Sequence, residues 1–542
     1  MKQRVRTRLG GHVLVESLEA LGAEVVFGLP GIHVLAIWEG LRTSDIRCLG
    51  FRTELNAGFA ADGYARVSGR PAPLLLSTGP GALNSLAALM EAASAHVPVV
   101  AIASQIPGDL IGRSRGYLHE LPNQLASFEP IVKWAARVTS PEGLPELLAE
   151  AWRRALTAPT GPVFLEIPVD VLTGPTEVPR IAELDTKPPA AAQPPPENLG
   201  EAAQLLASAR RPVLWAGGGV LRAGAWEEVA TLAERLGAPV ATTFMGKGAF
   251  PEDHPLAAGS GCDEAAFQQL LGDADVLLCV GTELGAETTG QYTLRFTGRL
   301  VQVDAAPERI GASYPALGLV GDAGATMRAL IELIPARRDD GSGEARVREL
   351  RERIERGLDA QGHELEQGLL RTIRSALPRE AVHAWDMTIL SYWAAAHFPA
   401  LAPRRFLYAL GSGTLGYALP AALGAKAALG DTQALAVVGD GGFLYGLQEL
   451  ASAREHSLGA KLLLVDDGGY GILREYQRAA YGETYGVDLL EPDFAALCAA
   501  FGVPVRMSDP ESVGADLAWA LELEGPAAVV LRATLASASA TS

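Results

Sequence analysis

Two neighbouring stretches of the chain decide both its fold and the kind of site that it carries. The stretch VGDGGF at positions 438–443 closes one apolar run, and DDGGYG at positions 466–471 follows a second run, KLLLV at positions 461–465. Short apolar runs bounded by turn residues predict buried strands. Each strand would deliver acidic and glycine residues at its carboxyl end, the edge of a parallel sheet where ligands bind.

These residue types suit a metal–diphosphate site. Mg²⁺ prefers oxygen ligands and is commonly shared between carboxylates and substrate phosphates, and glycines let backbone N–H groups approach phosphate oxygens. We expect Asp440 and Asp467 to bind the metal through their carboxylates and Gly469 through its carbonyl. Residues 441–443 would offer amides to the diphosphate at a helix N-terminus. Either segment alone could equally be an ordinary turn, so the interpretation depends on the pair.

The rest of the chain repeats the same strand-and-turn pattern. The apolar runs are Leu74–Ser77, Val99–Ser104, Val163–Asp170, Val213–Gly219, Val276–Gly281, Leu300–Asp304, Ala434–Gly439, Lys461–Asp467 and Ala527–Ala533. Helical patterns separate most of them. Continuous apolar strands that alternate with helices predict parallel sheets covered on both faces, so the predicted fold class is α/β.

Two linkers divide the chain into three domains, each expected to hold a central parallel sheet flanked by helices. Residues 185–197 read DTKPPAAAQPPPE, a Pro-rich spacer, and residues 336–343 read ARRDDGSG before a charged helical stretch at 344–370. The expected domains are 1–183, 198–335 and 371–534. The small polar residues of the tail, 535–542, predict a frayed end.

Composition excludes several classes of function. The net charge of −18 argues against a general nucleic-acid binder. No apolar stretch reaches membrane-spanning length without Gly, Pro or charge, and the basic start of the chain lacks an apolar signal region. The four cysteines are far apart in sequence, which predicts reduced thiols and no zinc site. We expect a cytoplasmic protein with no nucleic-acid partner and no membrane segment.

The pair of strand ends resembles the fingerprint of thiamine diphosphate (ThDP) enzymes. In that family Gly-Asp-Gly is followed, after a strand, by an Asn-Asn pair, and the first Asp, the second residue of the pair and a later carbonyl hold Mg²⁺. This chain has Asp466 and Asp467 where the family has the two asparagines, which adds negative charge beside the diphosphate. An aspartate still ligates Mg²⁺, so the resemblance implies ThDP and Mg²⁺ as cofactors.

The resemblance extends over nearly the whole chain and is closest to the acetohydroxyacid (acetolactate) synthase branch. The segments that carry it are FRTELNAGFAADGYAR at 51–66, STGPGALN at 77–84 and GSGTLGYALP at 411–420. Their order implies pyrimidine-binding, middle and diphosphate-binding domains. The resemblance assigns the following residues to the cofactor: Glu54, Pro80, Gly81, Asn84, Thr388, Gly413, Leu415, Gly439, Asp440, Gly441, Gly442, Asp467, Gly469, Tyr470, Gly471 and Ile472.

Two of these residues have specific roles in the family. Glu54 matches the acid that presses against the aminopyrimidine ring nitrogen, so that the cofactor's amino group can take the proton from its reactive carbon. Leu415 matches the bulky residue that bends the cofactor. The alternatives are a helix-start acid for Glu54 and an ordinary core leucine for Leu415.

Two histidines are candidates for moving protons to and from the substrate. His33 lies in GLPGIH at 28–33, which resembles the first strand and loop of the family, where benzaldehyde lyase has a histidine at the matching place. His119 stands where acetohydroxyacid synthases have a glutamine. Either could act as an acid or base, and the alternative for His33 is a surface or helix-start histidine.

Two departures from the synthase pattern concern cofactors and substrate. The stretch GTELGAE at 281–287 has no arginine where the synthases carry an arginine-rich segment, which argues against FAD. Residues 475–477 (EYQ) replace the branch's specificity tryptophan. Both speak against a standard branched-chain acetohydroxyacid synthase.

The resemblance implies a ThDP- and Mg²⁺-dependent C–C bond lyase or ligase that acts on 2-oxo acids. Acetolactate synthase-like carboligation through an enamine is the first expectation, and the alternative is non-oxidative 2-oxo acid decarboxylation or acyloin cleavage. A catalytically silent ThDP-binding regulatory homologue is the alternative of another class. The expected partners are a 2-oxo acid, aldehyde or acyloin, and further copies of the chain in a homodimer or homotetramer with active sites at the subunit interface.

Overall fold

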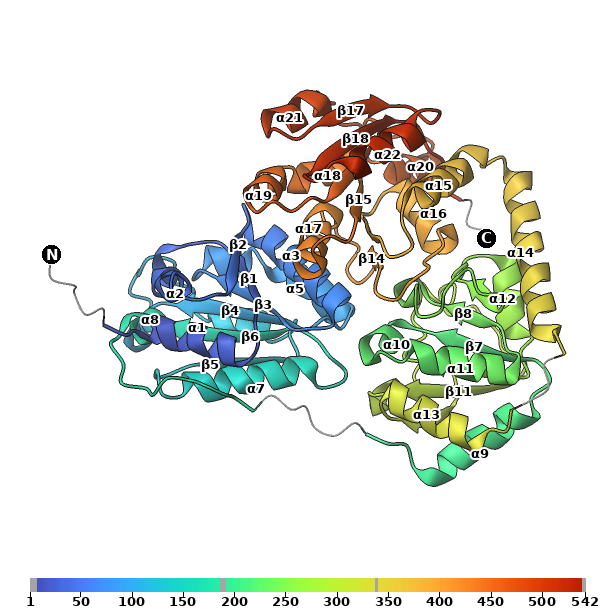
Figure 1. The fold of residues 1–542 in the computed structure, drawn as a ribbon, viewed down its shortest axis with the longest axis horizontal. Coiled ribbons are helices and arrows are strands. Elements are labelled where there is room, and N and C mark those ends of the chain that lie inside the picture. Colours follow the sequence, from blue (N-terminus) through green and yellow to red (C-terminus); the bar gives the residue numbers. More distant parts are fainter. Residues whose placement is uncertain (1–6, 186–191, 337–339, 539–542) are drawn as a thin grey trace. The chain divides into compact units, whose positions relative to one another are not determined.

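Three six-stranded sheets organise the chain, and all pairings between their strands are parallel (Figure 1). The structure is a computed structural model that describes residues 7–185, 192–336 and 340–538. The strand orders are β2-β1-β3-β4-β6-β5, β12-β11-β10-β7-β8-β9 and β14-β13-β15-β16-β18-β17. The predicted α/β fold with three helix-flanked parallel sheets is therefore confirmed.

The first sheet lies between two layers of helices. Its strands are β1 (Val25–Gly28), β2 (Arg47–Gly50), β3 (Ala72–Leu76), β4 (Val99–Gln105), β5 (Trp134–Arg137) and β6 (Val163–Pro168). Its helices are α1 (Gly10–Ala20), α2 (Leu35–Leu41), α3 (Glu54–Ser68), α4 (Pro80–Leu83), α5 (Leu86–Ser94), α6 (Gln124–Phe128), α7 (Leu144–Leu156) and α8 (Val169–Thr173). Leu75 of β3 packs in one core cluster with α1, α2 and α7, while its neighbour Leu74 faces α3. Alternate side chains thus bury both faces of the sheet.

The second sheet has the same construction. Its strands are β7 (Pro212–Ala216), β8 (Val240–Thr242), β9 (Ala257–Gly259), β10 (Val276–Val280), β11 (Arg299–Asp304) and β12 (Leu317–Val320). Its helices are α9 (Pro196–Ser208), α10 (Gly218–Ala223), α11 (Trp226–Leu236), α12 (Ala265–Gly272) and α13 (Ala323–Leu333). The first helix, α9, starts inside the predicted Pro-rich linker, because Pro196 occupies its first turn, where a missing N–H costs nothing. Residues 186–191 of that linker lie outside the described part of the chain.

The third sheet carries the two segments with which the sequence analysis began. Its strands are β13 (Val382–Trp385), β14 (Phe406–Tyr408), β15 (Ala434–Gly439), β16 (Lys461–Asp466), β17 (Val505–Ser508) and β18 (Ala527–Arg532). The helices of this region are α14 (Ser342–Gln361), α15 (Glu364–Ala376), α16 (Ile389–His397), α17 (Ala418–Leu429), α18 (Asp440–Gly446), α19 (Glu449–Glu455), α20 (Gly471–Tyr481), α21 (Phe494–Ala500) and α22 (Val513–Glu522). The charged stretch at 344–370 is helical as predicted, with a break at Gly362, whose φ of 74° ends α14.

The compact units differ from the domains expected from sequence. Each of the ranges 1–183, 198–335 and 371–534 encloses one sheet, but the chain divides into two units, and residues 409–431 and 444–460 group with the first sheet. The reason is the close packing of α17 on α3. A Cβ added at Gly63 would lie 2.2 Å from the carbonyl oxygen of Ala421, and one at Gly424 would lie 1.9 Å from that of Ala60. The domain boundaries themselves stay a prediction.

The predicted frayed tail is wrong for residues 535–538. Leu535 is buried, and the Ala536 N–H donates to Glu366 Oε1 at 2.8 Å. The carbonyl oxygen of Ala536 accepts a hydrogen bond from Trp393 Nε1, also at 2.8 Å. Residues 539–542 lie outside the described residues. Among the described residues, no helix is both long and apolar enough to cross a membrane.

Candidate active site

The carboxyl ends of β15 and β16 bring Asp440 and Asp467 to one edge of the third sheet. The two strands are parallel neighbours, with Gly439 paired to Val465. Asp440 opens α18 and is 3% exposed, and Asp467 follows β16 directly. Burial, together with the nearby Asp467 and Asp466 carboxylates, raises the pKa of Asp440 to about 6, against the lowering effect of the Gly441 and Gly469 N–H groups. Burial also raises the pKa of Asp467.

The loop after β16 is built around glycines. Gly468 has a φ of 76°, which favours glycine. A Cβ at Gly471 would lie 2.2 Å from Asp467 Oδ2, so only glycine allows this carboxylate its place at the start of α20. The Gly469 N–H lies close enough to both carboxylates to lower the pKa of Asp440 and of Asp467. This loop therefore fixes the two carboxylates beside each other.

The donor set fits a divalent cation that prefers oxygen ligands. Asp467 Oδ1 is buried and accepts no hydrogen bond, and Arg474 Nη1 lies 3.8 Å from it. The Gly469 carbonyl oxygen accepts one hydrogen bond, from Gly471 N at 3.2 Å, which leaves it a second lone pair. No cluster of three or more His, Cys, Asp or Glu suited to a metal occurs among the described residues, so further ligands would be backbone or phosphate oxygens. The residues predicted to hold Mg²⁺ thus have suitable chemistry.

The additional charge of Asp466 is partly offset. Asp466 is buried at the end of β16, and its Oδ2 lies 3.5 Å from Arg532 Nε. The first aspartate of the pair, Asp466, therefore faces an arginine of the adjacent strand β18. This arrangement reduces the repulsion that the Asp-Asp pair would exert on a diphosphate.

The end of a third strand, β13, contributes Thr388 and Asp386. A Cβ at Gly439 would lie 3.3 Å from Thr388 Oγ1, and one at Gly442 would lie 3.2 Å from Asp386 Oδ1. The structure thus brings the predicted residues Thr388, Gly439 and Gly442 together. Asp386 is fully buried and was not among the predicted contacts. The sequence signal that could have identified Asp386 was its position directly after an apolar strand.

Tyr470 and Ile472 flank the same loop. The Tyr470 ring lies over Gly441, because a Cβ there would be 2.6 Å from Tyr470 Cε1. Tyr470 also precedes the first residue of α20, and Ile472 is half-buried in the first turn of that helix. The predicted cofactor contacts of positions 439–442 and 467–472 therefore form one cluster.

Glu54 lies in a second cluster, in the other compact unit. It is the first residue of α3, but the helix is capped by Thr53, whose Oγ1 accepts from Asn56 N at 3.2 Å. The Glu54 carboxylate instead accepts a hydrogen bond from Asn84 Nδ2 at 3.2 Å. A Cβ at Gly81 would lie 3.0 Å from Glu54 Oε1. The predicted residues Glu54, Gly81 and Asn84 meet here, together with Pro80 at the start of α4.

The two candidate histidines contact each other. The ring centroids of His33 and His119 lie 5.3 Å apart, and Tyr117 lies 5.8 Å from His33. His33 is 5% exposed, so the surface alternative for it is wrong. Burial, and then the charge of His119, lower the pKa of His33. Nδ1 of each ring is buried without a hydrogen-bond partner, so both rings retain an unused polar atom.

A short loop places His119 beside the Gly-Pro-Gly turn. The Glu120 carboxylate accepts hydrogen bonds from the N–H groups of Gly116 and Tyr117 at 2.7 and 3.0 Å. His119 adopts a φ of 66°, which is uncommon for a residue with a side chain. Its carbonyl oxygen would lie 2.6 Å from a Cβ at Gly79. The histidine pair is therefore held next to the turn that contacts Glu54.

A buried network supports this turn, and sequence reasoning missed it. Gln124 Oε1 accepts from Gly79 N at 2.8 Å, while its Nε2 donates to Ser104 O at 3.0 Å and to Glu166 Oε2 at 3.2 Å. Gln105 Nε2 also donates to Glu166 Oε2, at 3.1 Å. Glu166 is fully buried within β6. An acid inside an apolar run was the available signal, whereas nothing in the sequence singled out Gln124.

The segment that contains Gly413 and Leu415 is fastened at both ends to the first sheet's helices. Near one end, Glu91 of α5 accepts hydrogen bonds from Ser412 N and Oγ at 2.7 and 3.0 Å. At the other end, Tyr417 donates its hydroxyl to Asp62 of α3 at 2.7 Å. Gly413 is exposed and Leu415 is half-buried. Leu415 is therefore not an ordinary core leucine, and its exposed part is free to contact a ligand.

Arg66 links the two ends of this segment. Its guanidinium forms ion pairs with Asp62 at 2.6 Å and with Glu91 at 2.7 Å, and both acids are fully buried. The Arg66 guanidinium also lies 5.3 Å from the centroid of the Tyr417 ring. Two buried carboxylates thus share one buried guanidinium, which compensates charges that would otherwise be costly to bury.

Comparisons with known proteins cover all three sheet-containing regions of the chain. Family models described as the thiamine pyrophosphate enzyme N-terminal TPP binding, central and C-terminal TPP binding domains match residues 8–127, 199–330 and 386–531. A probable 2-ketoarginine decarboxylase of Pseudomonas aeruginosa is 40% identical over 98% of this chain and 95% of its own length. A probable acetolactate synthase large subunit of Methanocaldococcus jannaschii is 33% identical, over 93% of this chain and 88% of its own length. The acetolactate synthase large subunit of Corynebacterium glutamicum is also 33% identical, over 93% and 83%.

Proposed function

Because the chain belongs to the thiamine diphosphate enzyme family, we propose that it is a Mg²⁺-dependent enzyme that removes CO₂ from a 2-oxo acid. The observation that carries this proposal is the pair of carboxylates at neighbouring strand ends, the buried Asp440 and the half-buried Asp467, whose Oδ1 is buried without a hydrogen bond. Asp440, Asp467 and the Gly469 carbonyl would hold the metal, and residues 439–442 and 470–472 would surround the diphosphate.

When bound, thiamine diphosphate supplies an electron sink for the electron pair that is left as the carboxylate departs as CO₂. Glu54 would hold a proton at the ring nitrogen of the aminopyrimidine, and its hydrogen bond from Asn84 orients the carboxylate for that contact. Leu415, fixed between Ser412 and Tyr417, would set the bend of the bound cofactor.

The histidine pair favours protonation of the product over carboligation. The buried His33 and the half-buried His119 lie beside the turn that contacts Glu54, and Nδ1 of each ring is buried without a hydrogen-bond partner. A nitrogen that carries a proton there would deliver it to the product carbon and yield an aldehyde. The 40% identity to a decarboxylase over the full chain supports the same outcome. Carboligation, favoured by the acetolactate synthase relatives, is the second candidate.

The test is an assay of CO₂ release and product identity with pyruvate and 2-ketoarginine, in the presence of ThDP and Mg²⁺. We expect an aldehyde from at least one 2-oxo acid, and the Glu54→Gln variant should lose at least about 100-fold in turnover. Glu129→Gln, an exposed change at the end of α6, is the matched control and should be fully active. Acyloin or acetolactate-type products would favour carboligation, and absence of ThDP binding in calorimetry would refute both.

We also propose that the active site is shared between subunits. The Glu54 and Asp440 clusters lie in different compact units of the chain. Large exposed apolar side chains accompany each cluster. They are Ile32, Leu35, Tyr117 and Leu118 near the histidines, and Leu444, Tyr445, Leu473 and Tyr476 on α18 and α20. Such surfaces are typical of subunit interfaces.

Co-expression of Glu54→Gln and Asp440→Asn chains tests the sharing directly. In a mixed dimer, one of the two sites would combine an intact Glu54 with an intact Asp440. Random pairing should then restore about a quarter of the wild-type activity. If each site were built within one chain, the mixture would stay inactive. FAD is not part of the proposal, so we expect a colourless protein.

A further inference from the structure

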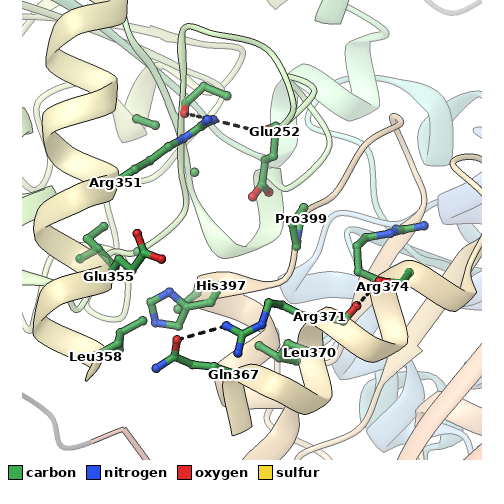
Figure 2. Close-up of a pocket in the computed structure, with 17 residues that line it drawn as sticks. Glu252, Arg351, Glu355, Leu358, Gln367, Leu370, Arg371, Arg374, His397 and Pro399 are labelled. Atoms are coloured by element: carbon green, nitrogen blue, oxygen red, sulfur yellow. Dashed lines mark hydrogen bonds between the residues drawn. The ribbon is translucent and has the colours of Figure 1, made fainter. Parts of the chain in front are cut away.

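A cavity of about 630 Å³ lies where the segment around β9 meets α14, α15 and the end of α16 (Figure 2). Its lining comes from one compact unit, and none of the lining residues is among the predicted cofactor contacts. The volume is large enough for a small organic ligand. The cavity therefore shares no lining residue with the predicted cofactor contacts.

Three arginines line the cavity, and none is neutralised by an acid. Within the described residues, Arg351, Arg371 and Arg374 form no ion pair with a carboxylate. Arg351 Nη2 donates to the carbonyl oxygens of Ala257 and Glu252 at 2.8 and 3.0 Å. Arg374 Nη2 donates to two carbonyl oxygens at 2.8 Å. These contacts position the guanidinium groups without cancelling their charge.

The acids of the cavity offset only part of this charge. The Glu252 carboxylate is already paired with the buried Lys247 Nζ at 2.8 Å. Glu355 is exposed on α14 and is the other acid of the lining. In a chain with a net charge of −18, a local excess of positive charge is unusual and points to an anionic ligand.

Two buried donors in the lining have no acceptor. Arg374 Nη1 and Gln367 Nε2 are both buried without a hydrogen-bond partner. Both groups can only donate, and a buried donor without a partner costs free energy. Figure 2 shows Gln367 next to Arg371, with which it shares a long hydrogen bond of 3.5 Å. An occupant that satisfies these donors must bring acceptor oxygens.

We propose that this cavity binds a small organic anion with at least two negative oxygens, a phosphate ester or a dicarboxylate. The guanidinium groups of Arg371 and Arg374 would form charge-assisted hydrogen bonds to those oxygens, for which their planar geometry is suited. The apolar side chains of Leu358, Leu370 and Pro399 would contact the body of the ligand. The site is independent of the proposed reaction.

The test is calorimetric titration of the protein, saturated with ThDP and Mg²⁺, with adenosine monophosphate and separately with succinate. The probe that binds more tightly shows whether the cavity prefers a phosphate ester or a dicarboxylate. Arg371→Gln should weaken that binding about tenfold. Arg371 is exposed, so this variant should fold normally. Arg356→Gln is the control, because Arg356 is exposed on α14, pairs with Glu352 at 3.8 Å and does not line the cavity.

Three outcomes are decisive. Binding that weakens in Arg371→Gln but not in Arg356→Gln supports the proposal. Equal affinities of Arg371→Gln and the wild type would place the anion elsewhere and overturn it. Absence of binding by either probe at about 10 mM would also overturn it. The ThDP affinity is measured in the same samples, so failure of the proposed function would be recognised separately.

Discussion

Replacing Asp440 by asparagine should stabilise the metal-free protein while it removes metal binding. Burial raises the pKa of Asp440 from 3.8 to about 6. Ionisation of this carboxyl is therefore less favourable in the folded protein than in the unfolded chain, by about two pH units. At about 1.36 kcal/mol per pH unit, the ionised carboxylate costs the folded state about 3 kcal/mol. An asparagine keeps an acceptor for the Gly441 and Gly469 N–H groups without this cost.

The effect depends on pH in a defined direction. Above pH 6, Asp440 is ionised in both states, and the folded state bears the full destabilisation. As the pH falls from 6 towards 3.8, the folded protein takes up the proton first, so the destabilisation disappears. The advantage of Asp440→Asn should consequently be full at pH 8 and nearly absent at pH 4.

Thermal unfolding of protein treated with a metal chelator measures this difference. At roughly 2 °C or more per kcal/mol for a domain of this size, the midpoint of Asp440→Asn at pH 8 should exceed that of the wild type by about 6 °C. Addition of Mg²⁺ and ThDP should stabilise the wild type but not the variant. Asp431→Asn, an exposed change, should have little effect at either pH. A variant that is less stable than the wild type at pH 8, or a gain that persists at pH 4, would refute the reasoning.

Three further substitutions test the packing and the buried network. Glu91→Gln leaves the buried Arg66 with one carboxylate fewer. It should therefore lower the free energy of unfolding by about 3 kcal/mol and weaken ThDP binding. An unchanged midpoint in chemical denaturation would contradict this expectation. Gly424→Ala puts a Cβ 1.9 Å from the carbonyl oxygen of Ala60 and should cost about 1–3 kcal/mol in chemical denaturation. Gly357→Ala, in α14 with no atom within 4 Å of the new Cβ, should instead stabilise by about 0.5–1 kcal/mol, and a loss of stability there would be unexpected.

The sequence was informative where chemistry depends on regular structure. The carboxyl ends of parallel neighbouring strands must share an edge of the sheet, so the proximity of Asp440 and Asp467 followed from the pattern of apolar runs. The same periodicity predicted three parallel sheets. The division into compact units differs from the expected domains because α17 packs on α3 through small residues. The pattern of apolar residues in the sequence does not show which helices pack against each other.

Contacts between loops could not be predicted in this way. The His33–His119 pair depends on the φ of 66° at His119 and on the hydrogen bonds that Glu120 accepts, which no periodicity encodes. The tail at 535–538 has small polar residues typical of frayed ends, yet its anchors, Glu366 and Trp393, lie far away in the sequence. Sequence composition describes a segment but not its distant partners.

Helix α3 carries functionally important residues at both of its ends. Its first residue is Glu54, and its third and fourth turns carry Asp62 and Arg66, which hold the segment around Leu415 in place. The acid at one end of α3 and the segment held near its other end therefore move with the same helix. A tilt of the helix axis would displace Glu54 and Leu415 at the same time, so α3 couples the two residues that the proposed function assigns to activating and bending the cofactor.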